Sequence, residues 1–183
     1  AKVLGQVAET WLADPKRSAE AQARLQSAQW PGNVRQLRNL LEGASVFAEG
    51  AELYRKAIAH DPEFAPAHAA LSLLLSIGHM IGYVTEPDEA LAEADRALAL
   101  DSDSSEVLGF VGCALSDLGN TTRGIELLEQ AIERDPSNAQ AWVALGAALL
   151  TARRPELAIE KLEHGLRISP RDNRLAVWGG ILA

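Results

Sequence analysis

Large apolar residues recur along most of this chain at intervals of three and four, with small residues between them. Leu108, Val111 and Leu115 show the spacing, which places side chains on one face of a helix. Short polar stretches such as DPSN and SPRD separate the apolar segments, and the proline in each cannot continue a helix. The pattern therefore predicts an all-α fold of short antiparallel helices.

The same pattern repeats along the chain. Residues 105–138 align without a gap on residues 139–172, which is a period of 34. Small residues coincide at the eighth, twentieth and twenty-seventh positions, where they let two helices approach closely: Gly112 with Gly146, Gly124 with Ala158, and Ala131 with Gly165. Each repeat is thus expected to be a hairpin of a first and a second helix.

Neighbouring segments continue the array. Residues 65–104 are expected to form a longer repeat, whose extra residues fall in IGHMIGYVTEP. This stretch either lengthens the two helices or makes a longer loop between them. Pro87 is expected at the start of the second helix. Residues 49–61 are expected to be the second helix of a preceding repeat. Residues 173–183 begin a first helix and form a partial repeat.

These residue types at this period resemble the tetratricopeptide repeat (TPR), and in particular the TPR regions of bacterial adenylate cyclases and transcription regulators. The resemblance covers about residues 50–183. It implies a right-handed α-solenoid and a non-enzymatic protein–protein interaction module that binds a protein or peptide in its concave groove.

The first 48 residues carry a different signature. Residues 30–39 read WPGNVRQLRN, and this string resembles the AAA+ lid of NtrC-type activators of sigma-54 RNA polymerase. In that family the arginine of the motif reaches the nucleotide, which would be Arg35 here if an ATPase core were present. The chain contains no G-x-x-x-x-G-K-[S/T] loop to hold phosphates, so we expect it not to be an enzyme.

A second interpretation applies to the same segment. Val34, Leu37 and Leu41 fall at the fourth, seventh and eleventh positions of a repeat that starts at Pro31. Residues 33–44 could therefore be the first helix of a TPR-like hairpin, and the two interpretations are compatible.

Charge and composition exclude some classes of function and favour one cellular compartment. The chain has a net charge of −8, and residues 51–183 hold twenty acidic against eleven basic residues. An acidic body repels phosphate backbones, so we expect no direct nucleic-acid binding. The single cysteine, Cys113, fits a reducing, cytoplasmic compartment, and no apolar run is long enough to span a membrane.

No metal or cofactor site is expected, because no two of the four histidines are three or four residues apart. His68 lies at a core position of its repeat and is expected to be buried with its polar atoms satisfied. Cys113 has no basic neighbour in sequence and is expected to be an ordinary small side chain.

The candidate protein-binding groove follows from the positions that line the concave face of TPR arrays. Applied to the two regular repeats, they give Glu106, Cys113, Ser116, Asp117, Val143, Ala147, Leu150 and Thr151. An apolar floor beside carboxylates predicts an amphipathic ligand with one or two basic residues. Val143 and Leu150 are expected to lie outside the hairpin core.

Two other functions remain open. The chain could be a fragment of an ATP-dependent sigma-54 transcription activator whose ATPase core is missing. Alternatively, it could be a structural adaptor that forms a homo-oligomer through its C-terminal partial repeat, where Leu175, Trp178 and Leu182 share one helix face.

Overall fold

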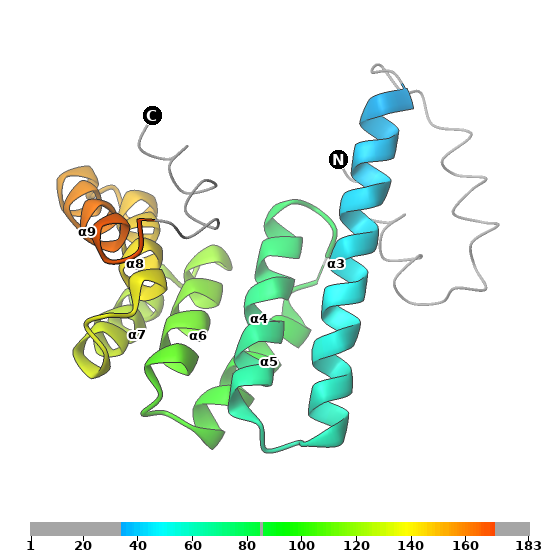
Figure 1. The fold of residues 1–183 in the computed structure, drawn as a ribbon, viewed down its shortest axis with the longest axis horizontal. Coiled ribbons are helices and arrows are strands. Elements are labelled where there is room, and N and C mark those ends of the chain that lie inside the picture. Colours follow the sequence, from blue (N-terminus) through cyan, green and yellow to red (C-terminus); the bar gives the residue numbers. More distant parts are fainter. Residues whose placement is uncertain (1–33, 85, 171–183) are drawn as a thin grey trace.

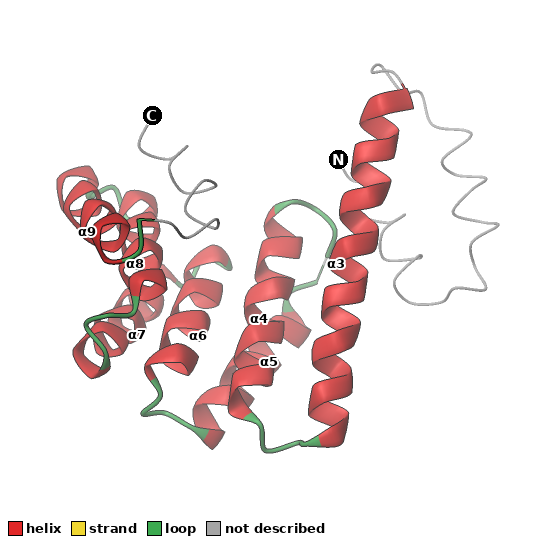
Figure 2. Ribbon diagram, in the orientation of Figure 1, coloured by secondary structure: helices red, strands yellow, loops and turns green. Residues whose placement is uncertain are grey.

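The computed structural model describes residues 34–84 and 86–170, and every regular element in these ranges is an α-helix (Figures 1 and 2). A long helix, α3 (Val34–His60), is followed by three hairpins. They are α4 (Ala65–Met80) with α5 (Asp88–Leu100), α6 (Ser105–Asp117) with α7 (Thr121–Arg134), and α8 (Ala139–Thr151) with α9 (Pro155–Ile168). The expectation of an all-α array of helix hairpins is confirmed.

The hairpins stack side by side in chain order. The first helices α4, α6 and α8 contact one another in sequence, and each also contacts its own second helix. The core runs through these contacts and is made largely of alanine, leucine and valine, with Leu108, Val111 and Leu128 almost fully buried. Alanine and glycine at the helix contacts let the backbones lie close together, which explains how so few aromatic residues suffice.

An aspartate ends each of the first three second-helix segments. Asp61, Asp101 and Asp135 each accept a hydrogen bond at Oδ1 from the backbone N–H two residues further on. This turn satisfies N–H groups that would otherwise lack a partner and directs the chain into the next first helix. Ser104 and Asn138 then cap α6 and α8 by accepting from the N–H of Val107 and Ala141.

The first hairpin is the longest, and its extra residues both lengthen a helix and lengthen the loop. α4 has 16 residues where α6 and α8 have 13. The connection to α5 is also longer, and Tyr83 and Val84 fold back so that their N–H groups donate to the carbonyl of Gly78. Pro87 stands at the N-cap of α5, as its position predicted.

The expected hairpin at the N-terminal end is not formed. The sequence predicts two separate helices at residues 33–44 and 49–61, but α3 runs without interruption from Val34 to His60. The physical reason lies in the intervening residues, 45–48, which contain no glycine or proline that could turn the chain. Gly43 and Gly50 are accommodated within the helix.

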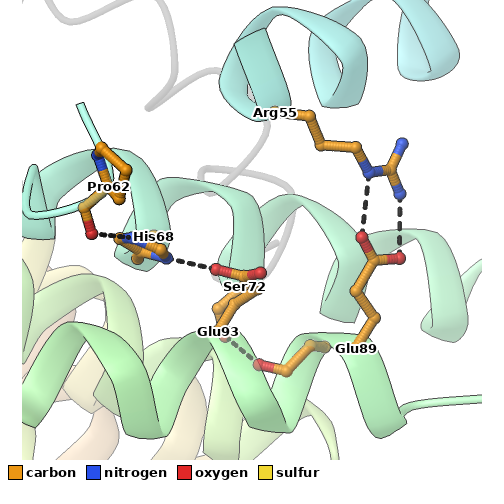
Figure 3. Close-up of polar contacts among 7 residues, drawn as sticks. Arg55, Pro62, His68, Ser72, Glu89 and Glu93 are labelled. Atoms are coloured by element: carbon orange, nitrogen blue, oxygen red, sulfur yellow. Dashed lines mark hydrogen bonds and ion pairs between the residues drawn. The ribbon is translucent and has the colours of Figure 1, made fainter. Parts of the chain in front are cut away.

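Polar side chains tie α3, α4 and α5 together (Figure 3). Arg55 of α3 donates two hydrogen bonds of 2.9 Å to the carboxylate of Glu89 in α5, and Ser72 of α4 donates to the carbonyl of Ala90. His68 is buried, with Nδ1 against the Glu93 carboxylate and Nε2 3.1 Å from the carbonyl of Pro62. The expectation of a buried, satisfied histidine is confirmed.

Other expectations lie outside the described residues. They concern the Trp30–Asn33 part of the lid-like motif and the partial repeat at 173–183, with its helix face of Leu175, Trp178 and Leu182.

Candidate protein-binding site

A continuous line of side chains runs along the accessible side of α6. Glu106, Phe110, Cys113 and Asp117 are spaced four, three and four residues apart, so they share one face of the helix. Glu106 is exposed, Phe110 and Asp117 are half-buried, and Cys113 is buried. The face therefore has a carboxylate at each end and an apolar middle.

The neighbouring first helices extend this face. In α4 the corresponding line contains Leu73 and Ile77, and in α8 it contains Ala147 and Thr151. Ile77 is 36% exposed and Thr151 is also exposed, while Leu73 and Ala147 are half-buried. We call this surface, formed by the accessible residues of α4, α6 and α8, the first-helix face.

Asp117 is the most unusual group on the first-helix face. Burial raises the pKa of its carboxyl to about 6, although a hydrogen bond from Ser76 of α4 lowers it. The Ser76 hydroxyl lies 3.3 Å from Asp117 Oδ2 and 2.8 Å from the carbonyl of Leu73, and a hydroxyl has one proton to share between them. No ion pair of the described residues involves Asp117.

Cys113 contributes packing rather than reactivity. Its Sγ lies 4.0 Å from Asp117 Oδ2, and burial together with the nearby carboxylate raises the pKa of the thiol. Only a thiolate is an effective nucleophile, so this cysteine remains a small apolar side chain.

Two of the candidate groove residues do not line the first-helix face. Val143 is 1% exposed and packs on Leu162 and Gly165 of α9, and Ser116 is turned toward Gly124 of α7 and donates to the carbonyl of Gly112. The expectation that Val143 lies outside the hairpin core is wrong. Glycines in the facing second helices bring the two backbones together, and this draws both side chains into the hairpin contact.

The other candidates occupy different settings. Glu106 and Thr151 are exposed, and Asp117 and Ala147 are half-buried. Leu150 is also half-buried and packs against the core. Phe110 was missed because the positions considered from the repeat pattern did not include the sixth. Its spacing of four residues from Glu106 was the signal that could have placed it on the same face.

Arg35, the candidate nucleotide-contacting residue, lies in the first turn of α3. The placement of its side chain is outside the described residues. In the described ranges there is no group of three or more His, Cys, Asp or Glu residues arranged to hold a metal ion. None of the helices between residues 34 and 170 is both long and apolar enough to cross a bilayer.

Two family models match parts of the chain. Residues 112–173 match the tetratricopeptide repeat, and residues 1–70 match the AAA+ ATPase lid domain. The second match includes all of α3 and the start of α4, so the lid-like segment and the helical array overlap along the chain.

Two curated relatives each match part of the chain. The chain is 34% identical over 115 residues to the type IV pilus assembly protein PilF of Pseudomonas aeruginosa, covering 62% of this chain and 44% of PilF. It is 40% identical over 92 residues to the alginate biosynthesis transcriptional regulatory protein AlgB of Pseudomonas syringae, covering 48% of this chain and 20% of AlgB. The shared stretch is thus less than half of either relative.

A solved structure supports the fold. The structure of Pseudomonas aeruginosa PilF aligns with a TM-score of 0.55 at 28% identity, covering 78% of this chain and 61% of that one. The described helices are therefore a TPR-type solenoid, and a solenoid of this type is a protein-interaction module.

Proposed function

Because this chain carries tetratricopeptide repeats behind a segment that matches an AAA+ ATPase lid, we propose that it is the regulatory part of a bacterial regulator and binds a peptide or helix on its first-helix face. The observation that carries the proposal is the half-buried carboxylate of Asp117, which forms no ion pair with the described residues and lies beside apolar side chains. Its ligand is an amphipathic helix with a basic residue next to its apolar stripe.

The chemistry of the face supports this ligand. Phe110 lies two helical turns before Asp117 on α6. On α4, Leu73 and Ile77 lie within one turn of Ser76, which contacts Asp117. A lysine or arginine brought next to Asp117 would form a charge-assisted hydrogen bond at a partly desolvated site, where such bonds are stronger than on an open surface. Glu106, at the far end of α6, would attract a second basic residue.

Selection of peptides from a random displayed library against the purified chain tests the proposal. We expect the selected peptides to combine leucine, isoleucine or phenylalanine with lysine or arginine, and to bind Ala147→Arg and Asp117→Lys at least tenfold more weakly than the parent. Glu126→Arg is the matched control, since Glu126 is exposed on the second helix α7. Equal binding to all four proteins would show that the first-helix face is not the site.

The lid match supports a second candidate function. Residues 1–70 match a domain that in AAA+ proteins belongs to an ATPase, and AlgB is a transcriptional regulatory protein. The chain would then be a part of an ATP-dependent sigma-54 activator in which Arg35 contacts the nucleotide of a core supplied elsewhere. Mixing the chain with an isolated AAA+ core and ATP, and comparing the parent with Arg35→Ala, tests this role.

A further inference from the structure

The small residues of the second helices are buried in every hairpin of the described array. They are Ala90 and Ala97 in α5, Gly124 and Ala131 in α7, and Ala158 and Gly165 in α9. The corresponding residues of α3 are Gly50 and Ala57, and both are half-exposed. α3 thus ends as a second helix whose small residues lack the cover that the others have.

The surroundings of Gly124 and Gly50 show that the described part of α3 lacks the first helix that packs on each other second helix. A Cβ atom built on Gly124 would lie 2.6 Å from the carbonyl oxygen of Gly112 and 3.0 Å from the amide nitrogen of Ser116, both in the backbone of its own first helix α6. Of the described residues, a Cβ atom on Gly50 would meet only the end of the Leu74 side chain, at 3.2 Å. Among the described residues, no first-helix backbone lies against Gly50.

Apolar side chains of α3 and α4 surround Gly50. Val46 and Leu53 lie on the same face of α3 as Gly50 and are 70% and 66% exposed. On α4, Leu74 is half-exposed, although Ala114 and Ala148 at the equivalent place in α6 and α8 are buried. We call this surface, made by Val46, Gly50, Leu53, Ala57 and Leu74, the first-helix slot.

The repeats themselves define which helix fits such a slot. In α6 the residues Leu108, Val111, Gly112 and Leu115 are large, large, small and large at the fourth, seventh, eighth and eleventh positions. Residues 1–13 read AKVLGQVAETWLA and have the same order of sizes at the same positions: Leu4, Val7, Ala8 and Trp11. Charged residues fall outside these four positions.

We propose that residues 1–13 fill the first-helix slot and complete the N-terminal hairpin of the solenoid, with residues 14–33 as the connection to α3. The match to the lid domain supports this, because a single family model spans the segment and the α3 wall of the slot. The connection is long enough: the residues from 14 to 33 reach about 60 Å when extended, against about 18 Å of helix from residue 34 to residue 46. Covalent attachment gives this segment a concentration at the slot that a separate partner does not have.

The repeat geometry selects the residues for a cross-linking test. Val143 and Gly165 are in contact, at the fifth and twenty-seventh positions of their repeat, and their counterparts are Gly5 and Ala57. In a Cys113→Ala background, we expect Gly5→Cys with Ala57→Cys to form a disulfide within one chain under mild oxidation. The control pair is Gln6→Cys with Ala57→Cys, in which the helical step of about 100° turns the first cysteine away.

The outcomes separate the possible occupants. A disulfide within the monomer for the first pair and little for the control supports the proposal. A disulfide between two chains would show that a second copy occupies the slot, and equal or no reaction of both pairs would show that this segment does not; either result overturns the proposal.

Hydroxyl-radical footprinting of the unmodified chain provides a test that needs no variant. Leu53 is 66% exposed among the described residues and Leu157 on α9 is 46% exposed. If residues 1–13 cover the slot, Leu53 is oxidised more slowly than Leu157. Oxidation of Leu53 at least as fast as that of Leu157 would contradict the proposal, and neither result depends on ligand binding at the first-helix face.

Discussion

Gly112 of α6 and Gly124 of α7 face each other so closely that neither can be given a side chain without moving the other helix. A Cβ atom on Gly124 would lie 2.6 Å from the carbonyl oxygen of Gly112, and one on Gly112 would lie 2.9 Å from the carbonyl oxygen of Gly124. Both contacts are with backbone, which cannot rotate away as a side chain can. The hairpin geometry is therefore specified by the absence of two side chains.

Substitution of these glycines is expected to destabilise the fold. Gly112→Leu or Gly124→Ala should lower the free energy of unfolding by about 1–3 kcal/mol, because the added atoms overpack the contact. Gly109→Ala is the matched control in α6: its Cβ would meet the movable end of Gln140 at 3.2 Å, and alanine favours the helix. Urea denaturation measures all three, and equal midpoints would mean that α6 and α7 are not packed as described.

The pair of His68 and Glu93 is expected to couple α4 to α5. The two ring nitrogens of His68 contact the Glu93 carboxylate and the Pro62 carbonyl. His68→Leu removes both contacts and leaves buried polar groups without this partner, so it should lower the free energy of unfolding by about 1–3 kcal/mol.

A double-mutant cycle separates this coupling from lost packing. His68→Leu with Glu93→Leu should cost less than the sum of the single substitutions, since the second change removes the acceptor that the first leaves unpaired. Additive effects in urea denaturation would show that the two side chains do not interact.

Asp117 should make stability depend on pH. The pKa of its carboxyl is raised to about 6 in the folded chain, against about 3.9 in an unfolded chain. Between these values the folded state binds more protons, so this group's contribution to stability is fully present below about pH 4 and is lost as pH rises through 6. The difference in urea midpoint between the parent and Asp117→Asn should therefore change across this window, and a constant difference would contradict the burial of the carboxylate.

The purified chain should not hydrolyse ATP. Its sequence has no phosphate-binding G-x-x-x-x-G-K-[S/T] loop, and an arginine alone can't position the phosphates or the attacking water. Phosphate release by the parent should equal that of Arg35→Ala at every ATP concentration. Turnover that the substitution abolishes would mean that the chain contains a catalytic centre of another kind.

The repeat period allowed much of the fold to be predicted, because close helix contacts restrict the residue type at fixed positions. Gly112, Gly124 and Pro136 define one hairpin by themselves, and the same positions recur one period later. α3 was divided wrongly because Gly50 fits the small position of a second helix, which led us to expect a turn before it. The residues from Ala44 to Glu49 are compatible with a helix, and their helix propensity, rather than the repeat period, accounts for the single continuous helix α3.

The candidate site was harder to predict than the fold. Successive side chains in a helix point in directions about 100° apart. A residue at the border of a helix face can therefore line the groove or lie in the contact between the two helices of a hairpin. Val143 lies at such a border, and the missing side chain of Gly165 leaves room for it in the core. The raised pKa of Asp117 depends on its burial beside α4, a contact between repeats that the sequence alone does not reveal.

The most direct test of the account is the affinity of the chain for two synthetic amphipathic helices that differ in one residue beside a leucine stripe, lysine in one and glutamine in the other. Fluorescence anisotropy at pH 7 should show at least fivefold tighter binding of the lysine peptide. The preference should disappear in Asp117→Asn and persist in Asp95→Asn, a control on the exposed side of α5. If neither peptide binds, or if the preference is the same in all three proteins, the first-helix face is not a site for basic amphipathic helices.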